Sequence, residues 1–73
     1  MQEKNIELER FSINLRKFRQ EKGLSQMEVA VSLNIPRSLY LRYESTKNTP
    51  DIRLSSLIKL ARYFNKSLDE FIN

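Results

Sequence analysis

The segment PRSLYLRYE, residues 36–44, carries the side chains of this sequence that are best placed to bind a polar partner. If the segment is helical, Tyr40 and Tyr43 point inward together. The opposite side then carries Arg37, Ser38, Leu41 and Arg42. Two guanidinium groups and a hydroxyl on one face offer hydrogen bonds to a ligand, whereas a helix that only packs into a core does not need them.

The sequence offers no catalytic group to accompany these side chains. It contains no cysteine and no histidine, which excludes disulfides, the usual zinc sites, cysteine nucleophiles and histidine bases. Serine hydroxyls without a neighbouring histidine are a poor basis for catalysis. We therefore expect a protein that is not an enzyme and that needs no metal, no cofactor and no small-molecule substrate.

The length and charge of the chain describe one small, mildly basic domain. Its 73 residues are near the lower limit at which a hydrophobic core holds a fold without disulfides or metals. The net charge of +4 fits a polyanionic partner, but many soluble domains are equally basic. The apolar runs are too short to span a membrane, and the charged start MQEKNIELER lacks the apolar stretch of a signal peptide. A cytoplasmic location is therefore expected.

Helix signals recur along the chain, whereas no strand-like alternation lasts long enough to predict a sheet. The pattern predicts an all-α domain over residues 8–73, preceded by a loosely ordered N-terminal extension, residues 1–7. The predicted helices cover about residues 8–22, 26–33, 36–45, 52–64 and 68–72.

The ends of these helices carry residues that favour helix boundaries. Gly23 follows the first predicted helix and favours its termination. Ser25 with Glu28 forms a capping box at the start of the second helix, and Ser67 with Glu70 forms another at the start of the last. These signals are local, so they place the boundaries without any knowledge of the tertiary fold.

A short link, residues 34–36, joins the second and third predicted helices. Asn34 tolerates the left-handed backbone conformation that a tight turn needs. Pro36 suits the first turn of the third helix, where its missing N–H group costs nothing. Asp51 is the expected N-cap of the fourth helix.

The two helices around this link carry a resemblance to a known family. The stretch GLSQMEVAVSLNI followed by PRSLYLRYE is similar to the lambda-repressor-like (Xre-type, Cro/CI) helix-turn-helix family. The resemblance covers roughly residues 11–73, from LRKFRQEKGLSQ to SLIKLARYFNKSLDEFI. Five residues stand in register with the family pattern: Arg19, Gly23, Gln26, Ala30 and Glu44. The resemblance implies a compact five-helix domain that binds double-stranded DNA and regulates transcription.

The resemblance also implies roles for the outer side of the third helix. In such domains this helix, here residues 36–45, lies in the major groove and its N-terminal part reaches the base edges. The expected base-contacting residues are Arg37, Ser38, Leu41 and Arg42. A guanidinium group can donate to guanine O6 and N7 together, and a leucine can contact a thymine methyl group. The alternative interpretation is that the two arginines are solvated surface residues.

Further roles follow from the same resemblance. Phosphate contacts are expected from Gln26, at the start of the second helix, and from Lys47 and Asn48 in the loop after the third. The alternative for Lys47 and Asn48 is that they are solvated loop residues without a partner. Arg19 and Glu44 are expected to form a structural ion pair. Since so small a domain reads only a few base pairs, a homodimer on a palindromic operator is expected. The expected dimer interface consists of Leu68, Phe71 and Ile72.

Some residues depart from the family pattern and support a different hypothesis. Met27 and Val31 are apolar where relatives have polar residues, and with Leu41 they form a candidate patch for a protein partner. The chain would then be a protein-interaction module, or an antitoxin-type regulator that also meets a regulatory protein partner. Alternatively, Ile6 and Leu8 of the N-terminal segment cover the patch. Arg16, Lys17 and Lys22 are expected to form a solvated face of the first helix.

Overall fold

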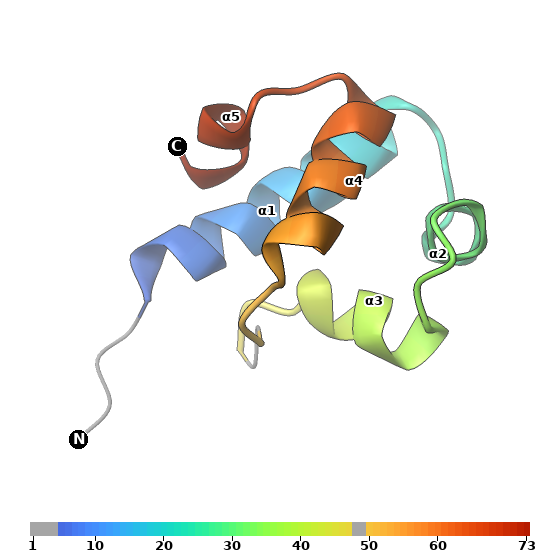
Figure 1. Cartoon of the computed structure of the whole chain (residues 1–73), viewed down its shortest axis with the longest axis horizontal. Helices are drawn as coiled ribbons and strands as arrows, with labels where there is room; N and C mark the ends of the chain where they lie inside the picture. Colours follow the sequence, from blue (N-terminus) through green and yellow to red (C-terminus); the bar gives the residue numbers. More distant parts are fainter. Residues whose placement is uncertain (1–4, 48–49) are drawn as a thin grey trace.

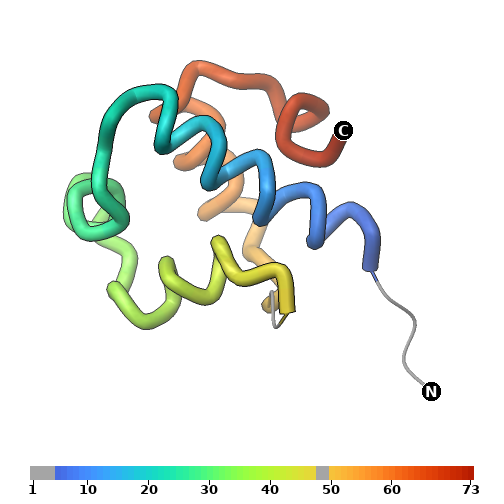
Figure 2. Tube along the Cα trace, turned by 180° about the vertical axis from the view of Figure 1, so that it is seen from behind, coloured from blue at the N-terminus to red at the C-terminus, as the bar shows by residue number. Residues whose placement is uncertain are grey.

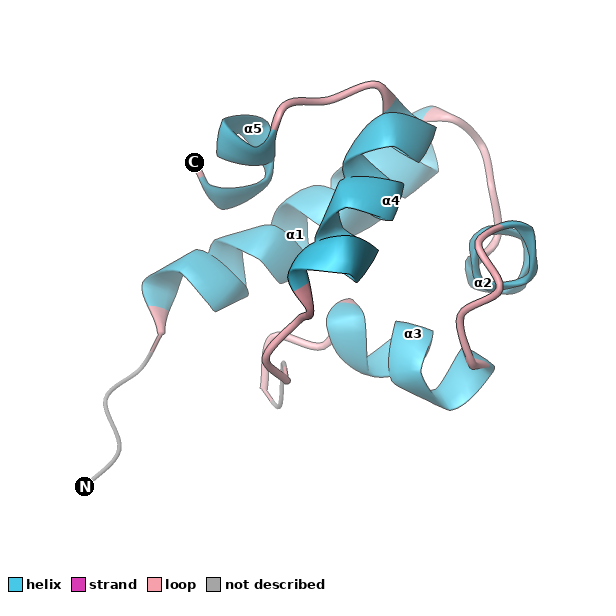
Figure 3. Ribbon diagram, in the orientation of Figure 1, coloured by secondary structure: helices cyan, strands magenta, loops and turns pink. Residues whose placement is uncertain are grey.

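The computed structural model describes residues 5–47 and 50–73, and these residues form five helices and no strand (Figures 1 and 3). The helices are α1 (Ile6–Glu21), α2 (Gln26–Ser32), α3 (Arg37–Tyr43), α4 (Leu54–Phe64) and α5 (Leu68–Ile72). The prediction of an all-α fold is therefore confirmed. None of the described helices is both long and apolar enough to cross a membrane.

Helix α1 begins two residues earlier than the sequence predicts, at Ile6 rather than at Leu8. The reason is the side chain of Asn5, whose Oδ1 accepts a hydrogen bond from the Leu8 backbone N–H at 3.1 Å and caps the helix. Ile6 and Glu7 therefore belong to the helix and not to a loose extension. Asn5 is the N-cap, and residues 1–4 of the predicted extension lie outside the described residues.

Helices α3 and α4 are shorter than predicted. Pro36 has an extended backbone (ψ 135°) and precedes α3 as its N-cap, while Glu44 follows it in a tight turn. Helix α4 begins at Leu54, so Asp51 is too far away to cap it, and Arg53 occupies the N-cap position with ψ 143°. Ile52 packs against the core, and Arg53 after it is extended, so the helix begins only after these two residues.

The local boundary signals are confirmed where they depend only on neighbouring residues. Both predicted capping boxes form, one at the start of α2 and one at the start of α5. Gly23 and Asn34 have the left-handed backbone expected of them, with φ of 68° and 54°. Asn65 adopts the same conformation, with φ of 55°, and ends α4.

Helices α1 and α5 lie side by side, although they come from opposite ends of the chain (Figures 1 and 2). Phe71 of α5 is completely buried between Phe11 and Phe18 of α1, with ring centroids 5.7 Å and 5.0 Å away. Asn14 closes this contact by donating from Nδ2 to the Phe71 and Asn73 carbonyl oxygens, both at 2.9 Å. The expectation that Phe71 contacts a partner subunit is therefore wrong, since it is a core residue of its own chain.

Helices α2 and α3 are held at a fixed angle by a small buried residue and a short link. Ala30 is buried where the helices meet, and its carbonyl oxygen accepts from the Ile35 N–H at 2.9 Å. Ile35 and Tyr40 fill the space beside it and are also buried. This packing turns one side of α3 toward the core and leaves the other side at the surface (Figure 1).

Candidate functional site

The outer face of α3 is built as the sequence predicts. Tyr40 and Tyr43 are buried on its inner side, whereas the opposite side is exposed to solvent. The exposed side chains are Arg37, Ser38, Leu41 and Arg42. Leu39 is half-buried and packs against the core cluster. The fold thus brings two cations, a hydroxyl and an apolar side chain together on one convex helix surface.

The buried carboxylate of Glu44 anchors the end of α3. It accepts from Arg19 Nε at 2.7 Å (Oε2) and from Arg19 Nη2 at 3.0 Å (Oε1). The Tyr40 hydroxyl donates to Oε2 at 2.6 Å, and Gln26 Nε2 donates to Oε1 at 3.2 Å. The side chain of Glu44 is only 1% exposed and that of Arg19 only 12%. One carboxylate therefore ties together α1, α2 and α3.

These contacts shift the ionisation of the three groups at the anchor. Burial raises the pKa of Glu44, but hydrogen bonds from Arg19, Tyr40 and Gln26 outweigh it and leave that pKa below its ordinary value. The hydrogen bond to Glu44 raises the pKa of Arg19. Burial, and then the neighbouring carboxylate, raise the pKa of Tyr40 well above its ordinary value. Glu44 is therefore charged and Tyr40 remains a hydrogen-bond donor at neutral pH.

The three expected phosphate-contacting residues have different surroundings. Gln26 is half-buried, and one N–H of its amide is already used by Glu44. Lys47 is exposed in the turn after α3. Asn48 lies outside the described residues. Gln26 and Lys47 line the same hollow of about 310 Å³, together with Glu44 and Leu41.

Arg16 also lines this hollow, and its position corrects the expectation of a merely solvated face. Its Nε lies 3.7 Å from Glu44 Oε1, so it takes part in the ion-pair network, while its side chain remains 58% exposed. A second contact nearby was missed as well: Ser12 Oγ donates to the Ser45 carbonyl oxygen at 3.2 Å. The signal available in the sequence was a row on α1, formed by Ser12, Arg16 and Arg19 at helical spacing.

Two apolar side chains of α2 remain at the surface. The side chains of Met27 and Val31 are 45% and 70% exposed. The prediction that Ile6 covers them is wrong, because Ile6 is itself exposed at the far end of α1 from α2 (Figures 1 and 2). Leu8 is half-buried on the first turns of the same helix.

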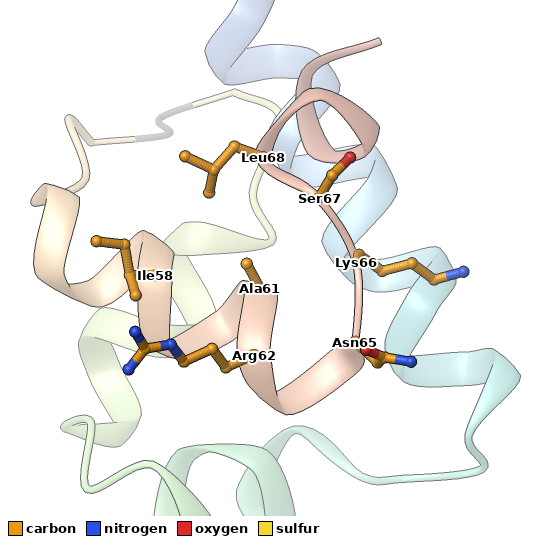
Figure 4. Close-up of a pocket in the computed structure, with 7 residues that line it drawn as sticks. All are labelled: Ile58, Ala61, Arg62, Asn65, Lys66, Ser67 and Leu68. Carbon is orange, nitrogen blue, oxygen red and sulfur yellow. The ribbon is translucent and has the colours of Figure 1, made fainter.

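A second hollow, of about 470 Å³, lies between α4 and α5. Ile58 and Leu68 point into it from the two helices, and Ala61 lies beside Ile58 (Figure 4). Arg62 lines it as well, whereas the side chain of Lys66 points away, with its ammonium group 4.8 Å from the centre of the Phe18 ring. Leu68 is 40% exposed and Ile72 is half-buried. Because Phe71 is buried, only Leu68 and Ile72 of the expected dimer interface are accessible at the surface.

Comparison with known proteins gives a consistent result. A helix-turn-helix family matches residues 15–71. The chain is 33% identical over 63 residues to the cryptic phage CTXphi transcriptional repressor RstR of Vibrio cholerae, covering 86% of this chain and 55% of that protein. It is 39% identical over 59 residues to the uncharacterized HTH-type transcriptional regulator YqaE of Bacillus subtilis (strain 168), covering 81% of this chain and 49% of that protein. The chain thus spans about half the length of these relatives. No solved structure matches.

Proposed function

Because the chain belongs to the helix-turn-helix family, in its Xre or lambda-repressor-like branch, we propose that it regulates transcription by binding a specific sequence of double-stranded DNA. The observation that carries this proposal is the exposed row on α3, Arg37, Ser38, Leu41 and Arg42, held in place by the buried Glu44 anchor. A cytoplasmic location belongs to the same proposal.

In the proposed complex α3 lies in the major groove. Arg37, at the first position of α3, is the leading base reader, because its guanidinium group can donate to guanine O6 and N7 together. Ser38 beside it donates to or accepts from a base edge. Leu41 contacts a thymine methyl group, and Arg42, one turn further on, contacts a base or a phosphate. Gln26, Lys47 and Asn48 contact phosphates and fix the orientation of α3.

The direct test is selection of duplexes from a random library at about 150 mM salt, close to physiological ionic strength. We expect enrichment of an inverted repeat that contains guanine, with half-site centres about 34 Å apart, one turn of the duplex. Retention at background with no enriched sequence would contradict the proposal and would direct attention to a protein partner of Met27 and Val31.

The inverted repeat is expected because we propose that a second copy of this chain covers the hollow between α4 and α5. Leu68 and Ile58 supply an apolar centre. Arg62 lines the hollow, and Asp69 follows Leu68 on α5 with its side chain exposed. In a two-fold arrangement centred on Leu68, the arginine of one copy can face the aspartate of the other. The surface is therefore complementary to itself in charge.

Replacing Leu68 by glutamate is expected to make the protein monomeric, because the substitution places a charge at the centre of the proposed apolar contact. Sedimentation equilibrium measures the change in mass. Operator affinity is expected to fall by about 100-fold or more, because a monomer loses the second linked contact. The matched control is Val31→Glu, an equally drastic change at an exposed apolar site on α2. A Leu68→Glu protein that remains dimeric would show that the interface lies elsewhere.

A further inference from the structure

We infer that the hollow between α1, α2 and the turn after α3 holds one phosphate group of the DNA backbone, and that Arg16 is a principal cation of this site. The inference rests on the proposed DNA binding, and it adds Arg16 to the phosphate contacts already proposed for Gln26 and Lys47. The hollow measures about 310 Å³ and is formed by residues of three helices. A phosphate group is small enough to enter it and still be contacted from several sides.

The charges around the hollow favour an anion. Glu44 at its base is negative, but Arg19 neutralises it through two hydrogen bonds of 2.7 Å and 3.0 Å. Arg16 and Lys47 also line the hollow, so two further positive charges remain. Because neither of these two side chains is buried, both can approach a ligand that arrives from solvent.

Arg16 is already directed toward this position. It lies on the same side of α1 as Ser12 and Arg19, which contact Ser45 and Glu44 at the end of α3. Its Nε is 3.7 Å from Glu44 Oε1, an ion-pair distance that is too long for a hydrogen bond. Among the residues that the structure describes, its guanidinium group donates no hydrogen bond. Its N–H groups are therefore available for phosphate oxygens.

The hollow also adjoins the face of α3 that is proposed to read bases. Leu41 belongs to both surfaces, since it is exposed on α3 and lines the hollow. A duplex lying against α3 therefore brings its backbone to the hollow. Gln26 strengthens the site, because one N–H of its amide is fixed on Glu44 at 3.2 Å and the other is left to donate to the phosphate.

The first test compares Arg16→Ala with Lys17→Ala on the duplex obtained by selection. Lys17 is exposed and lies about 100° around α1 from Arg16. Lys17→Ala therefore removes the same charge from a different face of the helix. Arg16→Ala is expected to reduce the slope of log affinity against log salt by about 1.8 for the dimer, the loss of one phosphate contact in each half-site. Arg16→Lys should retain most of the slope, whereas Lys17→Ala should retain all of it. Thermal melts of each variant confirm that the domain is folded.

The second test identifies the phosphate itself. Uncharged methylphosphonates replace single phosphates of the selected duplex, one position at a time. We expect one position in each half-site at which Arg16→Ala causes no further loss of affinity, because the partner of Arg16 is already gone. Lys47→Ala should show the same dependence at that position. Both results together support one shared phosphate site.

Two outcomes would overturn the inference, and they differ in what else they affect. In the first outcome, the wild-type protein binds its selected duplex, and Arg16→Ala has the same salt slope as the wild type. Arg16→Ala also loses the same affinity whichever phosphate is replaced by a methylphosphonate. Only the inferred phosphate site is then wrong. If the wild-type protein prefers no sequence and is indifferent to substitutions on α3, the proposed DNA binding is wrong and the site fails with it.

Discussion

Replacing Glu44 by alanine is expected to lower the free energy of unfolding by about 3–5 kcal/mol, the usual cost of removing one partner from a buried ion pair. The carboxylate accepts hydrogen bonds from Arg19, Tyr40 and Gln26, and its side chain is 1% exposed. Its removal leaves a largely buried guanidinium group without a counter-charge. A domain of this size has a total stability of about 4–11 kcal/mol, so the variant should lose a large fraction of it.

Urea denaturation followed by circular dichroism measures this loss. The matched control is Glu21→Ala, at an exposed glutamate at the end of α1, for which we expect a change within about 0.5 kcal/mol. Glu44→Gln keeps the shape of the side chain and removes only the charge, so it separates the ion pair from the packing. A loss below about 1 kcal/mol for Glu44→Ala would place the network among ordinary surface ion pairs.

The same carboxylate makes stability depend on pH in a predictable direction. Hydrogen bonds from Arg19, Tyr40 and Gln26 overcome the effect of burial and hold the folded-state pKa of Glu44 below the ordinary value of 4.5. Its contribution is therefore fully present above that ordinary pKa and is lost as the pH falls through the lowered one. The capping-box carboxylates Glu28 and Glu70 also have lowered pKa values, so they add to the acid sensitivity of every variant that retains them.

The difference between wild type and Glu44→Gln isolates the contribution of Glu44. Between about pH 6 and pH 3 the stability advantage of the wild type should shrink, because protonation abolishes the charge that the glutamine variant already lacks. A difference that stays constant over this range would show that Glu44 is not ionised in the folded protein.

Reversing both charges on the outer face of α3, with Arg37→Glu and Arg42→Glu together, is expected to abolish binding to the selected duplex. Each good bidentate arginine–guanine contact contributes about 1–3 kcal/mol of discrimination, and a carboxylate in the groove also repels the phosphates. Both side chains are exposed, so the fold should survive. The single change Arg37→Ala should relax the preference for guanine at one position of each half-site.

Fluorescence anisotropy with the selected duplex and with a scrambled duplex measures both effects. The control carries Arg10→Glu and Lys17→Glu, which change the net charge equally on exposed positions of α1 that point away from α3. This control variant should lose some affinity for both duplexes but keep its preference for the selected duplex over the scrambled one. If the reversal on α3 behaves like this control, α3 does not read bases. The alternative of a protein-interaction module would then be favoured, with Met27 and Val31 as its exposed apolar contacts.

Short-range signals in the sequence were sufficient for the helices and for the orientation of α3. Each capping box needs only a serine and a glutamate three residues apart. The turn between α2 and α3 needs only a residue that accepts a positive φ, and Asn34 has φ of 54°. The spacing of Tyr40 and Tyr43 fixes which side of α3 is buried. The resemblance to a family added the pairing of Arg19 with Glu44, which lie 2.7 Å apart at their closest.

The remaining features depend on contacts between residues far apart in the chain. Phe71 could be a surface or a core residue by its type alone, and only the packing of α5 against α1 buries it. Asp51 has the right chemistry for an N-cap, but Ile52 is drawn to the core and the helix starts later. Arg16 looks like any solvated arginine until the fold places Glu44 3.7 Å from its Nε. The sequence by itself determined the order of the helices and the exposed row of α3, because both follow from neighbouring residues. Only the tertiary structure decided which of the other side chains share a site, because that depends on how the helices pack.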